Sequence, residues 1–299
     1  MERDSHPIEA NLDMVLKNKK SIFARHQTFH LRDGWITKGL ELVNEEGNFK
    51  DDSHHDIGVG INMIKSIKHW LEASSLIKAN KTGFELTELG DFIYKNDRYF
   101  EDDASLWMIH YMLTKNITYA PVWFYIFNEN QDSTEFEIGK TEFFISSYFN
   151  KINKTSVSIN SIIKDLRCFS RTYTTDKAVD EFDISCPLSE LNLVNRSAKN
   201  NMFNLNFGKK DSLPLEVFLI SIIDFIGVST DVEIGRLRFN SLSPGRIFCL
   251  SFDAIRDYIA EACYKYPSFF TQVRTYESED FRILDDPKKI KSFLMENLY

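Results

Sequence analysis

The chain has 299 residues, which is enough for two or three domains with well-buried cores, so its stability does not depend on disulfides or a structural metal. A hydrophobic content of 43% with 14% aromatic residues describes a packed globular protein and excludes an intrinsically disordered one. The net charge of −8 excludes a protein that coats DNA indiscriminately, because non-specific affinity comes from neutralising phosphates.

The cysteines and the apolar segments indicate the environment of the protein. Four cysteines lie far apart without the spacing of a zinc site, which favours buried thiols in a reducing compartment. The amino terminus lacks the apolar core of a secretory signal. The most apolar stretch, residues 213–228, contains acidic residues and is shorter than the roughly 20 residues that span a bilayer. We therefore expect a cytoplasmic protein with a buried helix in this stretch and no membrane partner.

Residues 57–94 have the order of a winged helix-turn-helix. A glycine-marked turn precedes a helix expected over 61–77, in which Ile64, Ile67 and Leu71 recur at helical spacing. A hairpin closed near Lys81 follows, and then a helix with Thr87 as its N-cap. The opposite face of the first helix and the hairpin are suited to nucleic acid. They carry Asn62, Lys65, Ser66, Lys68, His69 and Lys81.

The local charge leaves two interpretations of this segment open. Residues 60–83 contain four lysines and a single glutamate, within a chain that is acidic as a whole. A basic face on an acidic body would attract a polyanion, whereas an ordinary solvated surface would have no partner.

A second helix-turn-helix pattern covers residues 141–171. A helix expected over 141–152 places Phe144, Tyr148 and Ile152 on one face, and polar residues break it before Ser158, the expected cap of the next helix. In that helix, residues 158–171, apolar side chains recur at i, i+3, i+4 and i+7 and predict one buried face. The opposite stripe has the chemistry that contacts base edges and phosphates. It consists of Asn160, Lys164, Arg167 and Arg171.

The remaining segments are expected to be scaffold. Aromatic residues are dense between Trp107 and Phe127, and a helical aromatic stripe is typical of a core. Alternating residues 203–207 predict a strand, and capping signals predict helices over 251–262 and 287–298. The sequence thus predicts a mainly α protein with small β wings (α+β), built from tandem winged helix-turn-helix-like units. The expected domains are a winged-helix-like domain with an aromatic helical extension (1–130), a second winged-helix-like unit (131–210) and a C-terminal helical domain (211–299).

A polar cluster precedes these units and also has two interpretations. Its arginines could clamp a phosphate, or the cluster could tie the amino-terminal segment to the winged helix through buried hydrogen bonds. Its histidines, four residues apart, could hold a metal ion with nearby carboxylates, as in a metal-dependent nuclease. No known catalytic motif is present in the sequence, so we expect no catalytic residues, no metal and no cofactor. The cluster consists of Arg25, His26, Thr28, His30, Arg32 and Trp35.

Three blocks of sequence, residues 21–35, 58–70 and 101–110, resemble the signatures of the bacterial "domain of unknown function 4007" family. Looser likeness at 186–188 and 244–248 extends this resemblance over nearly the whole chain. One departure is Ile61, where the family pattern has a lysine. The resemblance implies no activity, because the family has none established. It does imply a setting, since genes of this family tend to lie in phage-defence islands, near genes for DNA phosphorothioation.

These observations lead to two hypotheses. The first is a non-enzymatic DNA-binding accessory protein of a bacterial DNA-modification or phage-defence system, which contacts duplex DNA, modified or unmodified, through the helices at 61–77 and 158–171. The alternative is a protein–protein interaction subunit of such a complex that does not touch DNA. A continuous basic face would favour the first hypothesis, and a broad exposed apolar patch would favour the second.

Overall fold

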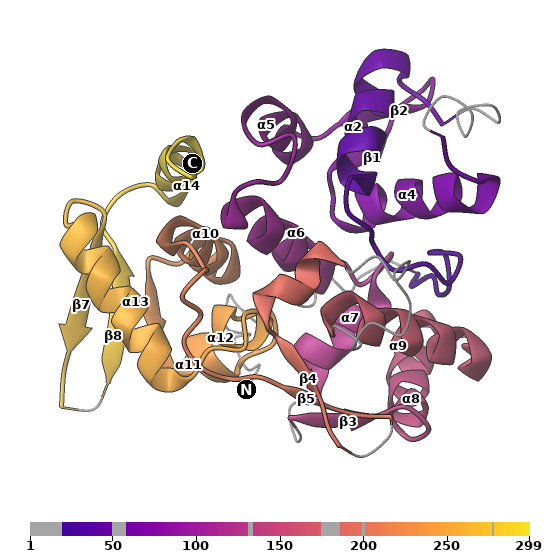
Figure 1. Ribbon diagram of the computed structural model, residues 1–299. Coiled ribbons are helices and arrows are strands. Elements are labelled where there is room, and N and C mark those ends of the chain that lie inside the picture. The colour runs from indigo at the N-terminus through magenta and orange to yellow at the C-terminus, as the bar shows by residue number, and fades with distance from the viewer. Residues whose placement is uncertain (1–19, 50–57, 131–133, 175–185, 199–200, 277) are drawn as a thin grey trace. The chain divides into compact units, whose positions relative to one another are not determined.

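The computed structural model describes residues 20–49, 58–130, 134–174, 186–198, 201–276 and 278–299 (Figure 1). The chain forms two compact units. The first unit comprises residues 19–126 and 132–206, and the C-terminal unit is built on residues 207–299 together with 127–131. The first unit takes in most of the two domains that the sequence analysis placed at 1–130 and 131–210. Helix α7 (Pro121–Phe124) packs on α9 (Ile159–Tyr173), and α6 (Asp103–Lys115) packs on the short helix η2 (Pro187–Leu191).

Small antiparallel sheets and helices alternate along the first unit. Its elements are α2 (Trp35–Glu46), α4 (Ile61–Ala73), β1 (Ile77–Ala79), β2 (Phe84–Leu86), α5 (Glu88–Asn96), α6 (Asp103–Lys115), α7 (Pro121–Phe124), β3 (Glu135–Glu137), α8 (Thr141–Asn153), α9 (Ile159–Tyr173), the 3-10 helix η2 (Pro187–Leu191), β4 (Val194–Arg196) and β5 (Met202–Leu205). A π-helical segment, Tyr125–Glu129, follows α7. This content confirms the expected α+β class.

Helix α4, the β1–β2 hairpin and helix α5 follow one another in the predicted order. Strands β1 and β2 pair antiparallel, with Ile77 opposite Leu86, and Thr87 caps α5 by accepting the Gly90 N–H at 3.0 Å. The helix expected over 61–77 ends at Ala73 instead. Ser75 adopts a left-handed φ of 56°, and the chain then turns into β1.

The second helix pair also forms where the sequence predicted it, but α8 packs through a different face. Its core face carries Ile145 and Phe149, whereas Phe144 is 66% exposed and Tyr148 is half-buried. The predicted apolar face of this helix therefore does not point into the core. The sheet beside the pair has the order β3-β5-β4, with both pairings antiparallel.

Aromatic side chains fill the core of the first unit, as the sequence predicted. Trp107, Tyr111 and Trp123 are almost completely buried, and Trp123 packs edge-on against Trp70 and Phe169. Helices α6, α7 and α9 and the sheet thus share one apolar interior.

The C-terminal unit contains a sheet that the expectation of a helical domain at 211–299 did not include. Its elements are α10 (Leu215–Ile226), β6 (Asp231–Glu233), α11 (Ile234–Phe239), α12 (Pro244–Ile247), α13 (Phe252–Lys265), β7 (Phe270–Arg274), β8 (Glu279–Ile283) and α14 (Pro287–Glu296). The three strands form an antiparallel sheet in the order β6-β8-β7. Helix α10 is buried on nearly every side, as predicted for residues 213–228. None of the helices in the described part of the chain has the length and apolar character needed to cross a membrane.

The cysteines match the expectation of unpaired thiols. Cys168, Cys186 and Cys249 are buried, Cys263 is half-buried, and none forms a disulfide. Burial raises the pKa of the Cys168, Cys186 and Cys249 thiols, so they remain protonated and unreactive at neutral pH.

Candidate nucleic-acid interface

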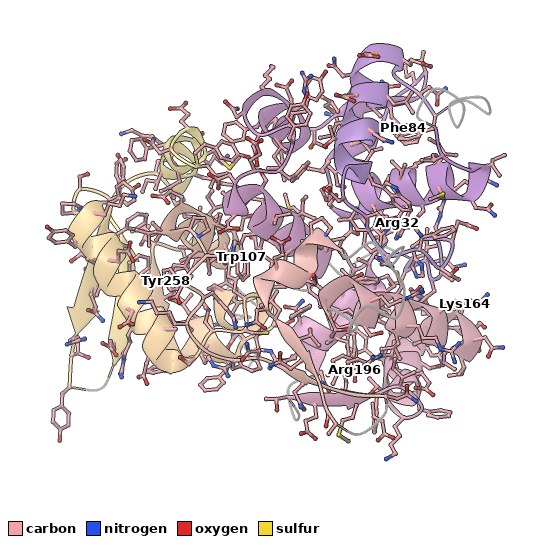
Figure 2. The ribbon with its side chains drawn as sticks, in the orientation of Figure 1. Arg32, Phe84, Trp107, Lys164, Arg196 and Tyr258 are labelled. Atoms are coloured by element: carbon pink, nitrogen blue, oxygen red, sulfur yellow. The ribbon has the colours of Figure 1, made fainter. Side chains whose placement is uncertain are left out.

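Helix α9 carries a polar stripe along its exposed side. On its inner side, Ile162, Leu166 and Phe169 pack into the core of the first unit. The helical period places the predicted stripe opposite these residues, and all of its members are exposed. They are Asn160, Lys164, Arg167 and Arg171. Figure 2 labels Lys164 on this helix.

Within the described part of the chain, no acid neutralises the centre of this stripe. The one carboxylate of α9, Asp165, is buried on the inner side of the helix. Lys164 and Arg167 form no ion pair with any described residue. Arg171 donates from Nη2 to the carbonyl oxygen of Thr28 at 2.8 Å and keeps its positive charge. The stripe is therefore a cationic surface that a polyanion can approach.

Helix α4 and its hairpin expose part of the cationic face that the sequence assigned to them. Asn62 and Lys65 are exposed, whereas the half-buried Lys68 places its ammonium 4.3 Å from the ring centroid of Phe84. Lys81 lies exposed in the turn of the hairpin. The hairpin also holds an exposed ion pair, in which Lys78 Nζ lies 3.1 Å from a Glu85 carboxylate oxygen.

Ser66 and His69 are buried, which corrects the prediction that they approach base edges. The buried arc of α4 is wider than its apolar spacing indicated, because α2 packs on one side and the segment around His26 packs on the other. Burial lowers the pKa of His69 to about 3, and the neighbouring His26 and Arg25 side chains act in the same direction. His69 is therefore neutral and enclosed at neutral pH.

The signature segment, residues 21–35, lies between α4 and α9 (Figure 1). The carbonyl oxygen of Phe29 accepts the indole N–H of Trp70 from α4 and the thiol of Cys168 from α9, each at 3.3 Å. One backbone group of the segment thus joins two helices that lie far apart in the sequence.

A buried histidine–aspartate pair anchors this segment to α9. His26 Nε2 lies 2.7 Å from Asp165 Oδ1, and both side chains are almost completely buried. Since His26 Nδ1 accepts the Thr28 N–H at 3.1 Å, the ring proton sits on Nε2 and is donated to the carboxylate. The same carboxylate oxygen accepts the Ala24 N–H at 2.8 Å. Burial raises the pKa of Asp165, against the effect of these hydrogen bonds, which lower it.

The predicted polar cluster is divided between the interior and the surface. His26, His30 and Trp35 are buried. Arg25 and Thr28 are exposed. The remaining member has a half-buried side chain over two aromatic rings. It is Arg32, whose guanidinium carbon lies 5.4 Å from the centroids of both the Phe29 and the Trp35 rings.

The sequence reasoning missed Asp165, although a signal was present. This acid falls on the same helical side as Ile162, Leu166 and Phe169, and an acidic side chain on a core-facing side requires a buried partner. No sequence signal identifies His26 as that partner, because the two residues are 139 positions apart.

The two histidines of the cluster do not assemble a metal site with acids or thiols of the described residues. In that part of the chain, no group of three or more His, Cys, Asp or Glu side chains could hold a metal ion. His26 uses both ring nitrogens in hydrogen bonds within the protein.

The family model described as "Protein of unknown function (DUF4007)" matches residues 23–299. The chain therefore belongs to this family. Two solved structures are similar over nearly their whole length. The structure titled "Magnesium ion-bound SspB crystal structure" has a TM-score of 0.85 and 22% identity, and the match covers 95% of this chain and 90% of the other. The one titled "SspB crystal structure" has a TM-score of 0.86 and 22% identity, with 96% and 90% covered. No curated protein matches.

Proposed function

We propose that this protein is a DNA-binding accessory protein of a bacterial DNA-modification or phage-defence system. The observation that carries the proposal is the exposed stripe of α9, which presents three cations and an amide and has no carboxylate among its members. A polyanion of regular charge spacing is the ligand that such a surface favours. The family resemblance, with its phosphorothioation and phage-defence setting, supports the choice of DNA.

The order of elements around α9 supports binding to duplex DNA. Strand β3, helices α8 and α9, and the β4–β5 hairpin occur in this order, with the 3-10 helix η2 between α9 and β4, and β3 pairs with β5. This is the order of a winged helix, in which the second helix of the helix-turn-helix enters the major groove. In this arrangement Asn160 approaches base edges, whereas Lys164, Arg167 and Arg171 contact phosphates.

Helix α4 with its β1–β2 hairpin supplies a second surface in the proposal. Its exposed Asn62 and Lys65 repeat the chemistry of the α9 stripe, and Lys81 adds a cation in the hairpin turn. Lys68 contributes a half-buried charge. The signature segment, which contacts both helices, provides a physical connection between the two surfaces.

Replacing two cations of the α9 stripe tests the proposal. We expect the double variant Lys164→Ala/Arg167→Ala to bind duplex DNA more weakly. The salt slope, by which we mean the magnitude of the negative slope of log K against log salt, should fall by about two, because each lost phosphate contact removes about 0.9. The measurement is a salt-titrated binding assay with duplexes that carry normal or phosphorothioate linkages. An unchanged slope would overturn the roles assigned to these residues.

A matched control separates the position of the charges from their number. Lys95 and Lys289 are exposed lysines on α5 and α14, each paired with an aspartate four residues earlier. The variant Lys95→Ala/Lys289→Ala changes the net charge by the same amount as the α9 variant. We expect it to keep the salt slope of the unmodified protein.

The second candidate is a protein-interaction subunit, and helix α8 favours it. Phe143 and Phe144 are 61% and 66% exposed, and Tyr148 and Ile152 are half-buried beside them. Exposed apolar patches of this kind mark protein interfaces. This candidate predicts that the α9 variant leaves the assembly of the complex intact, whereas Phe143→Ser/Phe144→Ser disrupts it.

A further inference from the structure

We propose that residues 24–28 of the signature segment form a second phosphate-contacting element beside α9, with Arg25 as the contacting cation and the His26–Asp165 pair as its positioning device. This inference rests on the proposed DNA-binding function and deepens it. It assigns separate tasks to the exposed and buried members of the polar cluster.

The exposure of successive side chains gives the segment an outer and an inner face. Arg25, Gln27 and Thr28 are exposed, whereas His26 between them is 1% exposed. The backbone is bent sharply to achieve this, because Ala24, Gln27 and Thr28 have left-handed φ values of 58°, 51° and 66°. Residues other than glycine rarely adopt this conformation, and it persists where the surroundings fix it.

Three hydrogen bonds fix the segment directly to α9. The Ala24 N–H and the His26 Nε2–H converge on Asp165 Oδ1, at 2.8 and 2.7 Å. The Thr28 carbonyl accepts the Arg171 guanidinium at 2.8 Å. Since Arg171 is itself a member of the cationic stripe, the outer face of the segment is continuous with that stripe.

The charge on Arg25 is available to an external anion. Arg25 is exposed and forms no ion pair with any described residue. Burial raises the pKa of Glu72 on α4, and the nearby charges of Lys68 and Arg25 lower it by less. A guanidinium can present two N–H groups to one phosphate, and a fixed backbone reduces the entropy lost on binding.

The first test removes the cation without disturbing the core. We expect Arg25→Ala to weaken duplex binding about tenfold and to lower the salt slope by about one, as for a single lost phosphate contact. Lys95→Ala, which removes one exposed charge from α5 of the same unit, is expected to leave both values unchanged. The measurement is the salt titration of the full chain with duplex DNA.

The second test distinguishes a role of His26 in positioning Arg25 from a role in stabilising the fold. The amide of glutamine can replace the Nε2–H donor of His26, whereas alanine cannot. We expect His26→Ala to lower the salt slope by about one although no charge on the surface changes, and His26→Gln to restore most of it. In the double variant Arg25→Ala/His26→Ala the slope falls no further than in either single variant, because both changes remove the same contact.

The outcomes distinguish this inference from the function on which it rests. Loss of binding in Lys164→Ala/Arg167→Ala with normal binding and slope in Arg25→Ala would overturn the inference and leave the DNA-binding function standing. Additive losses in the Arg25/His26 double variant would overturn the positioning role of His26. A normal salt slope in the α9 variant would overturn the phosphate contacts assigned to Lys164 and Arg167, whereas the absence of duplex binding by the unmodified protein would overturn the DNA-binding function itself.

Discussion

His69 is a buried ionisable side chain whose ring packs against His26 of the signature segment and Trp70 of α4. Burial lowers its pKa from the ordinary 6.5 to about 3. Its Nδ1 has no hydrogen-bond partner among the described residues. In the unfolded chain the same imidazole takes up a proton near pH 6.5, well above its pKa in the folded protein. Lowering the pH below about 6.5 therefore stabilises the unfolded state relative to the folded state. The stability from neutral His69 is therefore complete above about pH 6.5 and is lost as the pH falls toward 3.

The variant His69→Gln, which cannot titrate, is expected to depend less on pH. Between pH 6 and pH 4 the unmodified protein should lose about 1 kcal/mol more per pH unit than the variant, since one pKa unit corresponds to about 1.4 kcal/mol. Urea unfolding of both proteins at a series of pH values measures this difference. The raised pKa of Asp165 acts in the opposite direction but is common to both proteins. Parallel stability curves would show that His69 is not held neutral.

The burial of single residues was only partly predictable from the sequence. The helical period correctly separated Lys164 and Arg167 from the buried side of α9, because a single apolar face contacts the core. On α4 the same reasoning failed for Ser66 and His69. There the signature segment covers a side of the helix that the sequence pattern left polar, and no local signal shows that a distant segment returns to that place.

At the scale of elements, two helix caps that look equivalent in the sequence differ in the structure. Thr87 Oγ1 accepts the Gly90 N–H at 3.0 Å and donates to the Ser75 carbonyl at 2.7 Å. Ser158 occupies the N-cap of α9 without a capping hydrogen bond from its side chain. The two hydroxyls therefore contribute differently to the stability of the helices that follow them.

Alanine substitution at each cap tests this difference. We expect Thr87→Ala to lower the free energy of unfolding by about 1–2 kcal/mol, because a cap and a partly buried hydrogen bond are lost together. Ser158→Ala is the matched control, with an expected loss below about 0.5 kcal/mol. Denaturant unfolding monitored by circular dichroism measures both. Equal losses would contradict the cap geometry.

The elements themselves were more predictable than their ends and pairings. Capping residues and helical spacing located α5, α13 and α14, because these signals lie within a few residues of one another. The end of α4 was missed because neither glycine nor proline marks it, and Ser75 takes the left-handed conformation instead. The C-terminal sheet was missed because β6 has only three residues and its partner, β8, lies almost 50 positions later in the chain.

For the whole molecule, the net charge of −8 and the proposed DNA binding are compatible because the charges are unevenly distributed. Salt screens exposed charges beyond about 8–10 Å, so a phosphate responds mainly to its immediate neighbours. Near the α9 stripe these neighbours are cations. The C-terminal unit provides a contrast, since α13 exposes Asp253, Asp257 and Glu261 along one side. This chain thus contains helices with opposite surface charge.

Adding magnesium ions tests the proposed DNA binding of the whole protein, because Mg²⁺ competes with the cationic side chains of the protein for the phosphates of DNA. If binding depends on the exposed stripe, millimolar Mg²⁺ should weaken duplex binding at constant ionic strength, and a supercoiled plasmid incubated with the protein should stay intact. A gel-shift titration and a plasmid gel from the same samples measure both effects. Tighter binding with Mg²⁺ would instead indicate a metal bridge between acidic side chains and phosphates. Conversion of the plasmid to open circles that is lost in Lys164→Ala/Arg167→Ala would contradict the non-enzymatic role and place a magnesium-dependent nuclease on the same DNA-binding surface.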